Sequence, residues 1–234
     1  MECDYILVAT GSEPAFPPVP GLELAWTSED ALRFEGIPER LLVIGAGVVG
    51  LEFASIYAAF GSRVTVVEML ERALPMEDSE LGAELARRLK RAGISIHADT
   101  RVAGLDEDDG GFEAVLVKNG EKEELRLECD RVLVAAGRRP VFPGVEPEAL
   151  GLSVRQGALV VDGRLRTTLP RTYAAGDCIG GHMLAHVASY EAETAVEHMV
   201  TERGEVEYNA VPRCVFTIPE VAAVGTTEDD AREA

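Results

Sequence analysis

The sequence predicts an α/β protein with a parallel sheet, built around a Rossmann-like dinucleotide-binding unit. Three observations predict this fold. Residues 41–44 (LLVI) are wholly apolar, as a strand buried on both faces requires. Residues 45–50 (GAGVVG) have glycines in G-x-G-x-x-G spacing and open an apolar, helix-like segment that ends near Phe60. Residues 63–67 (RVTVV) are rich in valine and predict a second buried strand.

Each glycine of this motif has a mechanical role. Gly45 permits a tight turn from strand to helix, Gly47 lets the backbone approach a pyrophosphate, and Gly50 lets the helix pack closely on the sheet. The helix N-terminus adds amide donors and a positive dipole. Glu68 closes the second strand, 18 residues after Gly50, where a carboxylate can hold the ribose hydroxyls of an adenosine. A glycine-rich turn in another kind of α/β protein is the alternative, and it leaves Glu68 unexplained.

The acid at position 68 also selects the cofactor. A carboxylate there pairs with the free 2′-hydroxyl of NAD and repels the 2′-phosphate of NADP. Met69 and Leu70 follow it, so no basic cluster stands ready for a phosphate. We expect NAD as the cofactor.

Composition excludes several classes of partner. The chain has 234 residues with 22 basic and 41 acidic side chains, a formal net charge of −19. This balance argues against nucleic acid and anionic membranes as partners. No apolar run approaches the roughly 20 residues of a membrane span, and no targeting segment is visible, so a cytoplasmic location is expected. The four cysteines form no C-x-x-C pair and are expected to be buried, reduced thiols: Cys3, Cys129, Cys178 and Cys214.

The other elements follow from periodicity and turn residues. An apolar strand at 5–9 has no partner before it, so we expect its sheet neighbours to lie elsewhere. Residues 112–117 and 124–127, joined through Asn119-Gly120, predict a β-hairpin inserted into the α/β unit. Ser28 is expected to cap a first helix and Thr227 to begin a last one. The helix that Ser28 caps is expected at 26–34, and further helices are expected at 79–92 and 183–199. Strands are expected at 94–97, 131–136, 159–161, 165–167, 172–177, 214–217 and 221–224.

Two patterns invite a metal ion, and neither predicts one. The acidic run at 106–111 (DEDDGG) lacks the glutamate that a calcium loop would place at Val117, so a solvated turn is expected. Cys178, His182 and His186 have C-x₃-H-x₃-H spacing, but no fourth zinc ligand lies nearby in the sequence. We expect no metal site.

Six segments resemble the flavin-dependent pyridine nucleotide-disulfide oxidoreductases, and within them the dihydrolipoamide dehydrogenases. They are VATGSEP (8–14), GAGVVGLE (45–52), VLVAAGRRP (132–140), YAAGD (173–177), MLAH (183–186) and FTIPEVAAVG (216–225). MLAH, continued as VAS, is similar to the lipoamide branch in particular. The resemblance implies NAD and FAD as cofactors, dihydrolipoamide carried on a lipoyl domain as substrate, and a homodimer for the full-length enzyme.

The resemblance also implies two sets of cofactor-binding residues. NAD would be bound by Gly45, Ala46, Gly47, Val48, Val49, Gly50, Leu51 and Glu52, with Glu68 at the adenosine ribose, Val102 at the adenine and Gly137 beneath the nicotinamide. FAD would be bound by Thr10, Gly11, Ser12, Asp177, Met183, Leu184, Ala185 and His186. Asp177 would accept hydrogen bonds from a ribityl or neighbouring hydroxyl; a turn cap is its structural alternative.

Parts that the family uses are missing from this sequence: a first glycine motif for FAD, two redox cysteines four residues apart, and a His-Glu acid-base pair. We therefore expect a fragment that is inactive alone, has no catalytic residue, and self-associates through the strand at 5–9. Its expected divisions are 1–24 and 144–208 (parts of a discontinuous FAD-binding domain), 25–143 (NAD-binding domain) and 209–234 (start of an interface, or dimerisation, domain). A stand-alone NAD-binding module, or a fragment of another NADH-dependent flavoprotein disulfide reductase, are the alternatives.

Overall fold

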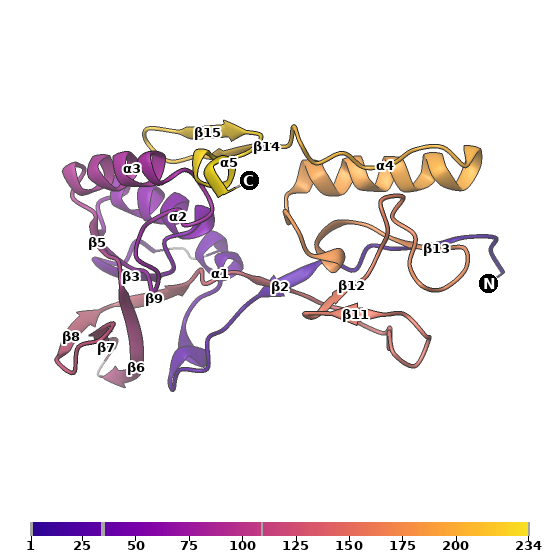
Figure 1. Cartoon of the computed structure of the whole chain (residues 1–234). Helices are drawn as coiled ribbons and strands as arrows, with labels where there is room; N and C mark the ends of the chain where they lie inside the picture. Colours follow the sequence, from indigo (N-terminus) through magenta and orange to yellow (C-terminus); the bar gives the residue numbers. More distant parts are fainter. Residues whose placement is uncertain (1, 34–35, 109, 234) are drawn as a thin grey trace. The chain divides into compact units, whose positions relative to one another are not determined.

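The computed structural model describes residues 2–33, 36–108 and 110–233 (Figure 1). Backbone contacts divide the chain into two compact units. Unit 1 holds Met1–Glu13 and Arg138–Val211, and unit 2 holds Pro14–Gly137 and Pro212–Ala234. Within the described residues, no helix has the length and apolarity needed to cross a membrane.

Unit 2 is built on a parallel sheet with the strand order β5–β4–β3–β9, which confirms the predicted α/β fold. The strands are β3 (Arg40–Ile44), β4 (Arg63–Val67), β5 (Ser95–His97) and β9 (Arg131–Val134). Side chains alternate across β3, so Leu41 and Val43 pack against helices α2 (Val48–Ala59) and α3 (Ser79–Arg91). Leu42 and Ile44 point to the opposite face, where they join a second core cluster.

That second face is covered by a three-stranded antiparallel meander of β6 (Thr100–Asp108), β7 (Gly111–Lys118) and β8 (Glu124–Cys129). The expected two-stranded hairpin is therefore incomplete, because the pattern does not predict β6. The acidic residues Asp106 and Asp108 lie in β6 and not in a turn, while Asp109 lies outside the described residues. Figure 1 shows the meander on one side of the sheet and α2 and α3 on the other.

Several element boundaries differ from the prediction for local reasons. Helix α1 (Ser28–Arg33) is capped by Thr27 and not by Ser28: the Thr27 amide donates to Asp30 Oδ2 at 2.8 Å, and the Asp30 amide donates back to Thr27 Oγ1 at 3.3 Å. The expected strand at 165–167 is reduced to an isolated bridge between Arg166 and Tyr173.

Unit 1 is held by a parallel pair, β1 (Ile6–Val8) with β13 (Thr172–Ala174). The expectation that the strand at 5–9 lacks a neighbour in this chain is therefore wrong. Its partner ends at Ala174, before the 3₁₀ helix η2 (Gly176–Ile179), so the expected strand 172–177 is shorter. The other elements are β2 (Ser12–Pro14), β10 (Arg138–Pro140), β11 (Val154–Arg155), β12 (Ala158–Leu159) and α4 (Ala185–Thr201).

The last segment, with β14 (Pro212–Val215), β15 (Val221–Val224) and α5 (Glu228–Glu233), belongs to unit 2. Several polar contacts hold it there, one of them from the Glu228 amide to Asp78 Oδ1 at 2.7 Å. The guanidinium of Arg213 donates through Nε to Glu77 Oε1 at 3.0 Å, and Glu77 is only 5% exposed. The Phe216 amide donates to Glu52 Oε1 at 2.7 Å.

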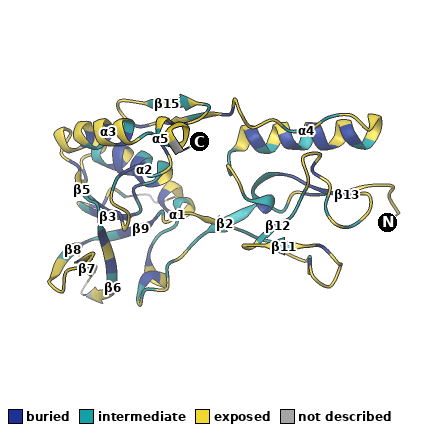
Figure 2. Cartoon of the chain, viewed as in Figure 1, coloured by how far each residue is buried: buried dark blue, intermediate teal, exposed yellow. Residues whose placement is uncertain are grey.

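Burial separates the cysteines into two pairs. Cys129 and Cys178 are buried, as expected, whereas Cys3 and Cys214 are exposed; all four are free. Figure 2 shows that β3 and α2 contain many of the buried residues of unit 2. β3 and α2 flank the predicted glycine turn directly. The core of unit 2 therefore forms around the predicted nucleotide-binding motif.

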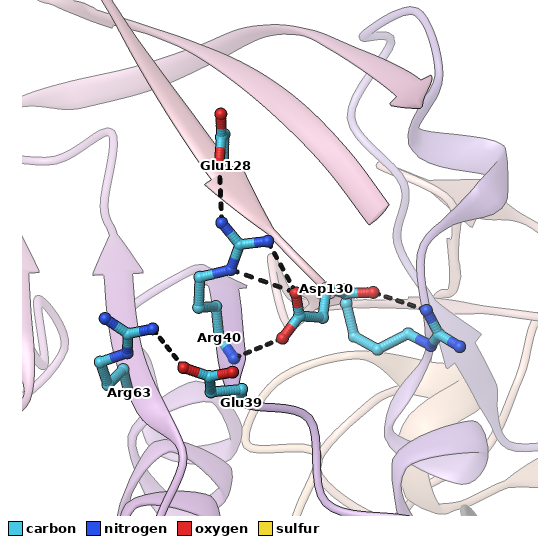
Figure 3. Close-up of polar contacts among 6 residues, drawn as sticks. Glu39, Arg40, Arg63, Glu128 and Asp130 are labelled. Atoms are coloured by element: carbon cyan, nitrogen blue, oxygen red, sulfur yellow. Dashed lines mark hydrogen bonds and ion pairs between the residues drawn. The ribbon is translucent and has the colours of Figure 1, made fainter. Parts of the chain in front are cut away.

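An ionic cluster at the starting edge of the parallel sheet ties β3 to β9 (Figure 3). Asp130 Oδ2 accepts the Arg40 backbone amide at 2.8 Å, and Asp130 Oδ1 accepts Arg40 Nη2 at 2.8 Å. Arg40 Nη1 also donates to Glu128 at 2.8 Å. Burial would raise the pKa of the Asp130 carboxyl, but the hydrogen bonds and charge of Arg40 outweigh it and lower this pKa below 3.8.

Replacing Asp130 should destabilise unit 2. We expect Asp130→Asn to lower the free energy of unfolding by about 1–2 kcal/mol at neutral pH, because the three hydrogen bonds that the Asp130 carboxylate accepts from Arg40 are weakened at a partly exposed site. The carboxylate's contribution is complete above pH 3.8 and is lost as the pH falls through the lower pKa of the folded chain. Urea unfolding at neutral and acid pH tests this, since the two proteins should converge in acid. Glu128→Gln, at a more exposed partner of Arg40, should have a smaller effect; equal stability of Asp130→Asn and the unmodified chain would contradict the assignment.

Candidate dinucleotide site

The glycine turn between β3 and α2 is shaped by close backbone approaches. Gly45 has φ of +108°, and a Cβ there would lie 2.4 Å from the carbonyl oxygen of Ala135, the residue that follows the neighbouring strand β9. A Cβ on Gly50 would lie 1.9 Å from the carbonyl oxygen of Gly45. Gly47 differs, because a Cβ there would meet nothing within 4 Å. The turn is thus packed against backbone atoms at Gly45 and Gly50 and is open at Gly47. A turn that receives a pyrophosphate needs such an open position.

The N-terminus of α2 lies at this open side. Gly47 is the N-cap and provides no side-chain acceptor for the first amides of the helix. No capping side chain occupies these amides, so a ligand could bind them without displacing one. They also lie at the positive end of the helix dipole. The site has the donor set that a phosphate group requires.

Glu68 joins the glycine turn to the end of the neighbouring strand. It follows β4 and is 8% exposed. Its Oε2 accepts the Ala46 amide at 2.7 Å, and its Oε1 accepts the Leu70 amide at 2.8 Å. Each carboxylate oxygen has a further lone pair, so Glu68 can accept from ligand hydroxyls while it keeps both bonds.

The predicted α2 residues divide between the core and the surface. Leu51 is fully buried and Val48 packs against the same core cluster, whereas Val49 is exposed. Glu52, one turn into the helix, is engaged by the Phe216 amide. Only part of the predicted stretch therefore has side chains available to a ligand, and the remainder would act through its backbone.

The two remaining predicted contacts of this site lie on β6 and after β9. Val102 is 6% exposed and packs with Leu42, Ile44 and Leu116 beneath the sheet, which leaves little of its side chain for an adenine ring. Gly137 has φ of +112°, and a Cβ there would meet nothing within 4 Å, so its surface is open. Both roles stay predictions.

In unit 1 the predicted flavin residues Ser12 and Asp177 meet. The Ser12 hydroxyl donates to Asp177 Oδ2 at 2.5 Å. Arg138 completes the group: its Nε donates to Ser12 Oγ at 2.7 Å and lies 3.7 Å from Asp177 Oδ2. Sequence reasoning missed Arg138, although it lies within the GRRP segment that carried the resemblance, because no local spacing relates it to residues so far away in the chain.

The turn that carries Asp177 is held from beneath by a buried acid. Glu191 on α4 is 3% exposed; its Oε2 accepts the Gly176 amide at 2.7 Å and its Oε1 accepts the Tyr208 hydroxyl at 2.8 Å. Burial, reinforced by Glu191, raises the pKa of Tyr208. The other predicted flavin residues lie at the starts of two elements. Thr10 and Gly11 precede β2, Met183 and Leu184 precede α4, and Ala185 and His186 are the first two residues of α4.

The two buried thiols, Cys129 and Cys178, are poor nucleophiles because burial favours their protonated form. Burial raises the pKa of Cys129 to about 12 and raises the pKa of Cys178, whose Sγ donates to the carbonyl oxygen of Ala175 at 3.2 Å. In the part of the chain that the structure describes, no group of three or more histidine, cysteine or acidic residues is placed to hold a metal ion.

Comparisons with known proteins agree with this geometry. A family model described as pyridine nucleotide-disulphide oxidoreductase matches residues 1–192. The dihydrolipoyl dehydrogenase of Bacillus subtilis is 36% identical over 233 residues, covering 99% of this chain and 50% of that protein. That of Haloferax volcanii is 40% identical over 241 residues, covering 100% of this chain and 50% of that protein. This chain thus spans about half the length of the curated relatives it matches.

Solved structures give the same result. LpdA from Mycobacterium tuberculosis superposes with a TM-score of 0.89 at 31% identity, covering 100% of this chain and 50% of that one. RclA, an HOCl-induced flavoprotein disulfide reductase from Escherichia coli, has a TM-score of 0.87 at 30% identity, covering 99% of this chain and 53% of that one. The chain belongs to the pyridine nucleotide-disulphide oxidoreductase family, whose cofactors are NAD and FAD.

Proposed function

We propose that this chain binds NAD(H) through unit 2 and is part of a dihydrolipoamide dehydrogenase. The observation that carries the proposal is the buried Glu68 carboxylate beside an open glycine turn. A carboxylate at this place selects a ribose with a free 2′-hydroxyl, and the uncapped amides of α2 suit a pyrophosphate. The residues present therefore fit NAD.

Unit 1 would contribute part of a flavin site. The hydroxyl of Ser12 and the carboxylate of Asp177 form a hydrogen-bonded pair that can exchange partners with ligand hydroxyls. The Glu191 carboxylate holds the turn that orients Asp177, and Arg138 neutralises its charge. Bound FAD would accept two electrons from a reduced pair of cysteines and supply hydride transfer to NAD, while these side chains would bind and orient it.

The substrate and assembly of the whole protein are part of the same proposal. Its relatives named dihydrolipoyl dehydrogenase favour dihydrolipoamide on a lipoyl domain as the substrate and a homodimer as the assembly. The expected domain roles, with NAD bound by 25–143 and FAD by 1–24 and 144–208, belong to it as well. A cytoplasmic location fits the four free cysteines, since disulfides are rare in reducing compartments.

A second candidate is membership of another NADH-dependent disulfide reductase. The observation that favours it is the similarity to RclA, a flavoprotein disulfide reductase, with a TM-score of 0.87 at 30% identity. The two candidates share the nucleotide site and differ in the substrate that reduces the flavin.

Glu68 should control both the affinity for NADH and the discrimination against NADPH. Loss of charge-assisted hydrogen bonds to ribose should make Glu68→Ala bind NADH about tenfold more weakly. Fluorescence titration measures both cofactors. Glu68→Gln, which keeps the size and the acceptor oxygen, should lose less NADH affinity and should bind NADPH better than the unmodified chain does. Equal affinity of the unmodified chain for NADH and NADPH would contradict the assignment.

The chain alone should not oxidise dihydrolipoamide. Its cysteines lie at positions 3, 129, 178 and 214, so the sequence contains no pair four residues apart to form a redox disulfide. A steady-state assay with added FAD, NAD and dihydrolipoamide should give only the free-flavin background. Turnover that disappeared in Cys178→Ser or Cys214→Ser would show that one of these thiols is catalytic.

The chain should also purify without bound FAD. It has one G-x-G-x-x-G motif, which the proposal assigns to NAD, and therefore no second glycine turn for the pyrophosphate of FAD. The absorption spectrum of the purified chain should lack flavin bands. A yellow protein with stoichiometric FAD would show that Asp177 and its neighbours are sufficient for flavin binding.

A further inference from the structure

We propose that Asn119, on the meander turn between β7 and β8, is a positioning residue that orients the Glu68 carboxylate. This inference rests on the proposed NAD binding and concerns its ribose end. The side chain of Asn119 reaches across to the loop that follows β4: its Nδ2 donates to the carbonyl oxygen of Met69 at 2.8 Å. The same nitrogen donates to Asp99 Oδ1 at 3.0 Å.

The contact acts on Glu68 through one peptide group. The carbonyl of Met69 and the amide of Leu70 belong to the same planar unit, with the C=O and N–H pointing in opposite directions. Asn119 binds the oxygen, and the Leu70 amide donates to Glu68 Oε1 at 2.8 Å. Fixing the carbonyl therefore fixes the direction of the N–H that holds the carboxylate. Polarisation of the peptide by the first bond also strengthens the second.

The loop is held at its other atoms by the segment that enters the meander. The Asp99 amide donates to the carbonyl oxygen of Leu70 at 2.8 Å, and the Thr100 amide donates to that of Glu68 at 2.9 Å. Asp99 has φ of +54°, an uncommon conformation for a residue other than glycine. The Asn119 amide donates to the carbonyl oxygen of Asp99 at 2.8 Å, which secures this residue. Among these contacts, the Asn119–Met69 bond alone acts on the Met69–Leu70 peptide from its carbonyl side.

Turn formation alone is the competing explanation for an asparagine before Gly120. Asn119 is not among the residues with positive φ, so its backbone conformation does not require asparagine. The same turn also contains Glu121, whose amide donates to the carbonyl oxygen of Lys118 at 3.0 Å and whose carboxylate pairs with Lys118 Nζ at 3.1 Å. Glu121→Ala therefore perturbs the turn without touching Met69, which makes it a matched control.

A double-mutant cycle with Glu68 tests the inference in the whole chain. Asn119→Ala should weaken NADH binding about threefold, the equivalent of one net hydrogen bond, and should reduce the ratio of NADH to NADPH affinity. Asn119→Asp should be worse, because it sets a carboxylate against the Met69 carbonyl and the Asp99 carboxylate. In the Glu68→Ala background, Asn119→Ala should have no further effect. Glu121→Ala should bind both cofactors as the unmodified chain does.

A measurement without ligand separates this inference from the proposed function. In the free chain, hydrogen exchange at the Leu70 amide, followed by NMR, should accelerate in Asn119→Ala and stay unchanged in Glu121→Ala. An unmodified chain that binds no NADH would overturn the proposed function, while the Leu70 exchange would still report whether Asn119 holds Glu68. Unchanged Leu70 exchange in Asn119→Ala, or an equal loss of NADH affinity with and without Glu68, would overturn the inference.

Discussion

The backbone contact between Gly50 and Gly45 is the constraint on which the rest of unit 2 depends. A methyl group on Gly50 would lie 1.9 Å from a carbonyl oxygen, so any side chain there would push α2 away from the sheet. With α2 in place, Leu51 and Ala54 complete the core over β3. The same approach sets the helix N-terminus directly above the strand ends. The same pair of glycines therefore allows α2 to pack on the sheet and sets the position of the candidate ligand site.

Glu68 shows how a buried charge is made compatible with this packed turn. A carboxylate that is 8% exposed would be costly without partners, and two backbone amides supply them. One amide comes from the glycine turn and the other from the loop that Asn119 braces. The meander is thus joined by hydrogen bonds to the centre of the candidate site and is more than a cover for one face of the sheet.

The sequence predicts local structure well here and distant contacts poorly. It predicts β3, α2 and β4 because apolar runs and glycines report burial and turns within a few residues. It misses β6 because the acidic end of this strand has the composition of a turn, although pairing with β7 stabilises it as a strand. Thr27, and not Ser28, caps α1 because Asp30 completes a reciprocal pair that the shorter spacing cannot make. Arg138 and Asn119 escape prediction because each acts on residues far away in the sequence, which no periodicity encodes.

The two ends of the continuous part of unit 2 meet: the Ala15 amide donates to the carbonyl oxygen of Gly137 at 3.0 Å. A segment whose ends adjoin can be inserted into a loop of a host protein, or removed from one, with little strain on either side. The stretch Pro14–Gly137 therefore has the geometry of a transferable cassette. Because the segment from Pro212 packs on the same unit, a transfer would also have to carry or replace its contacts with Glu77 and Glu52.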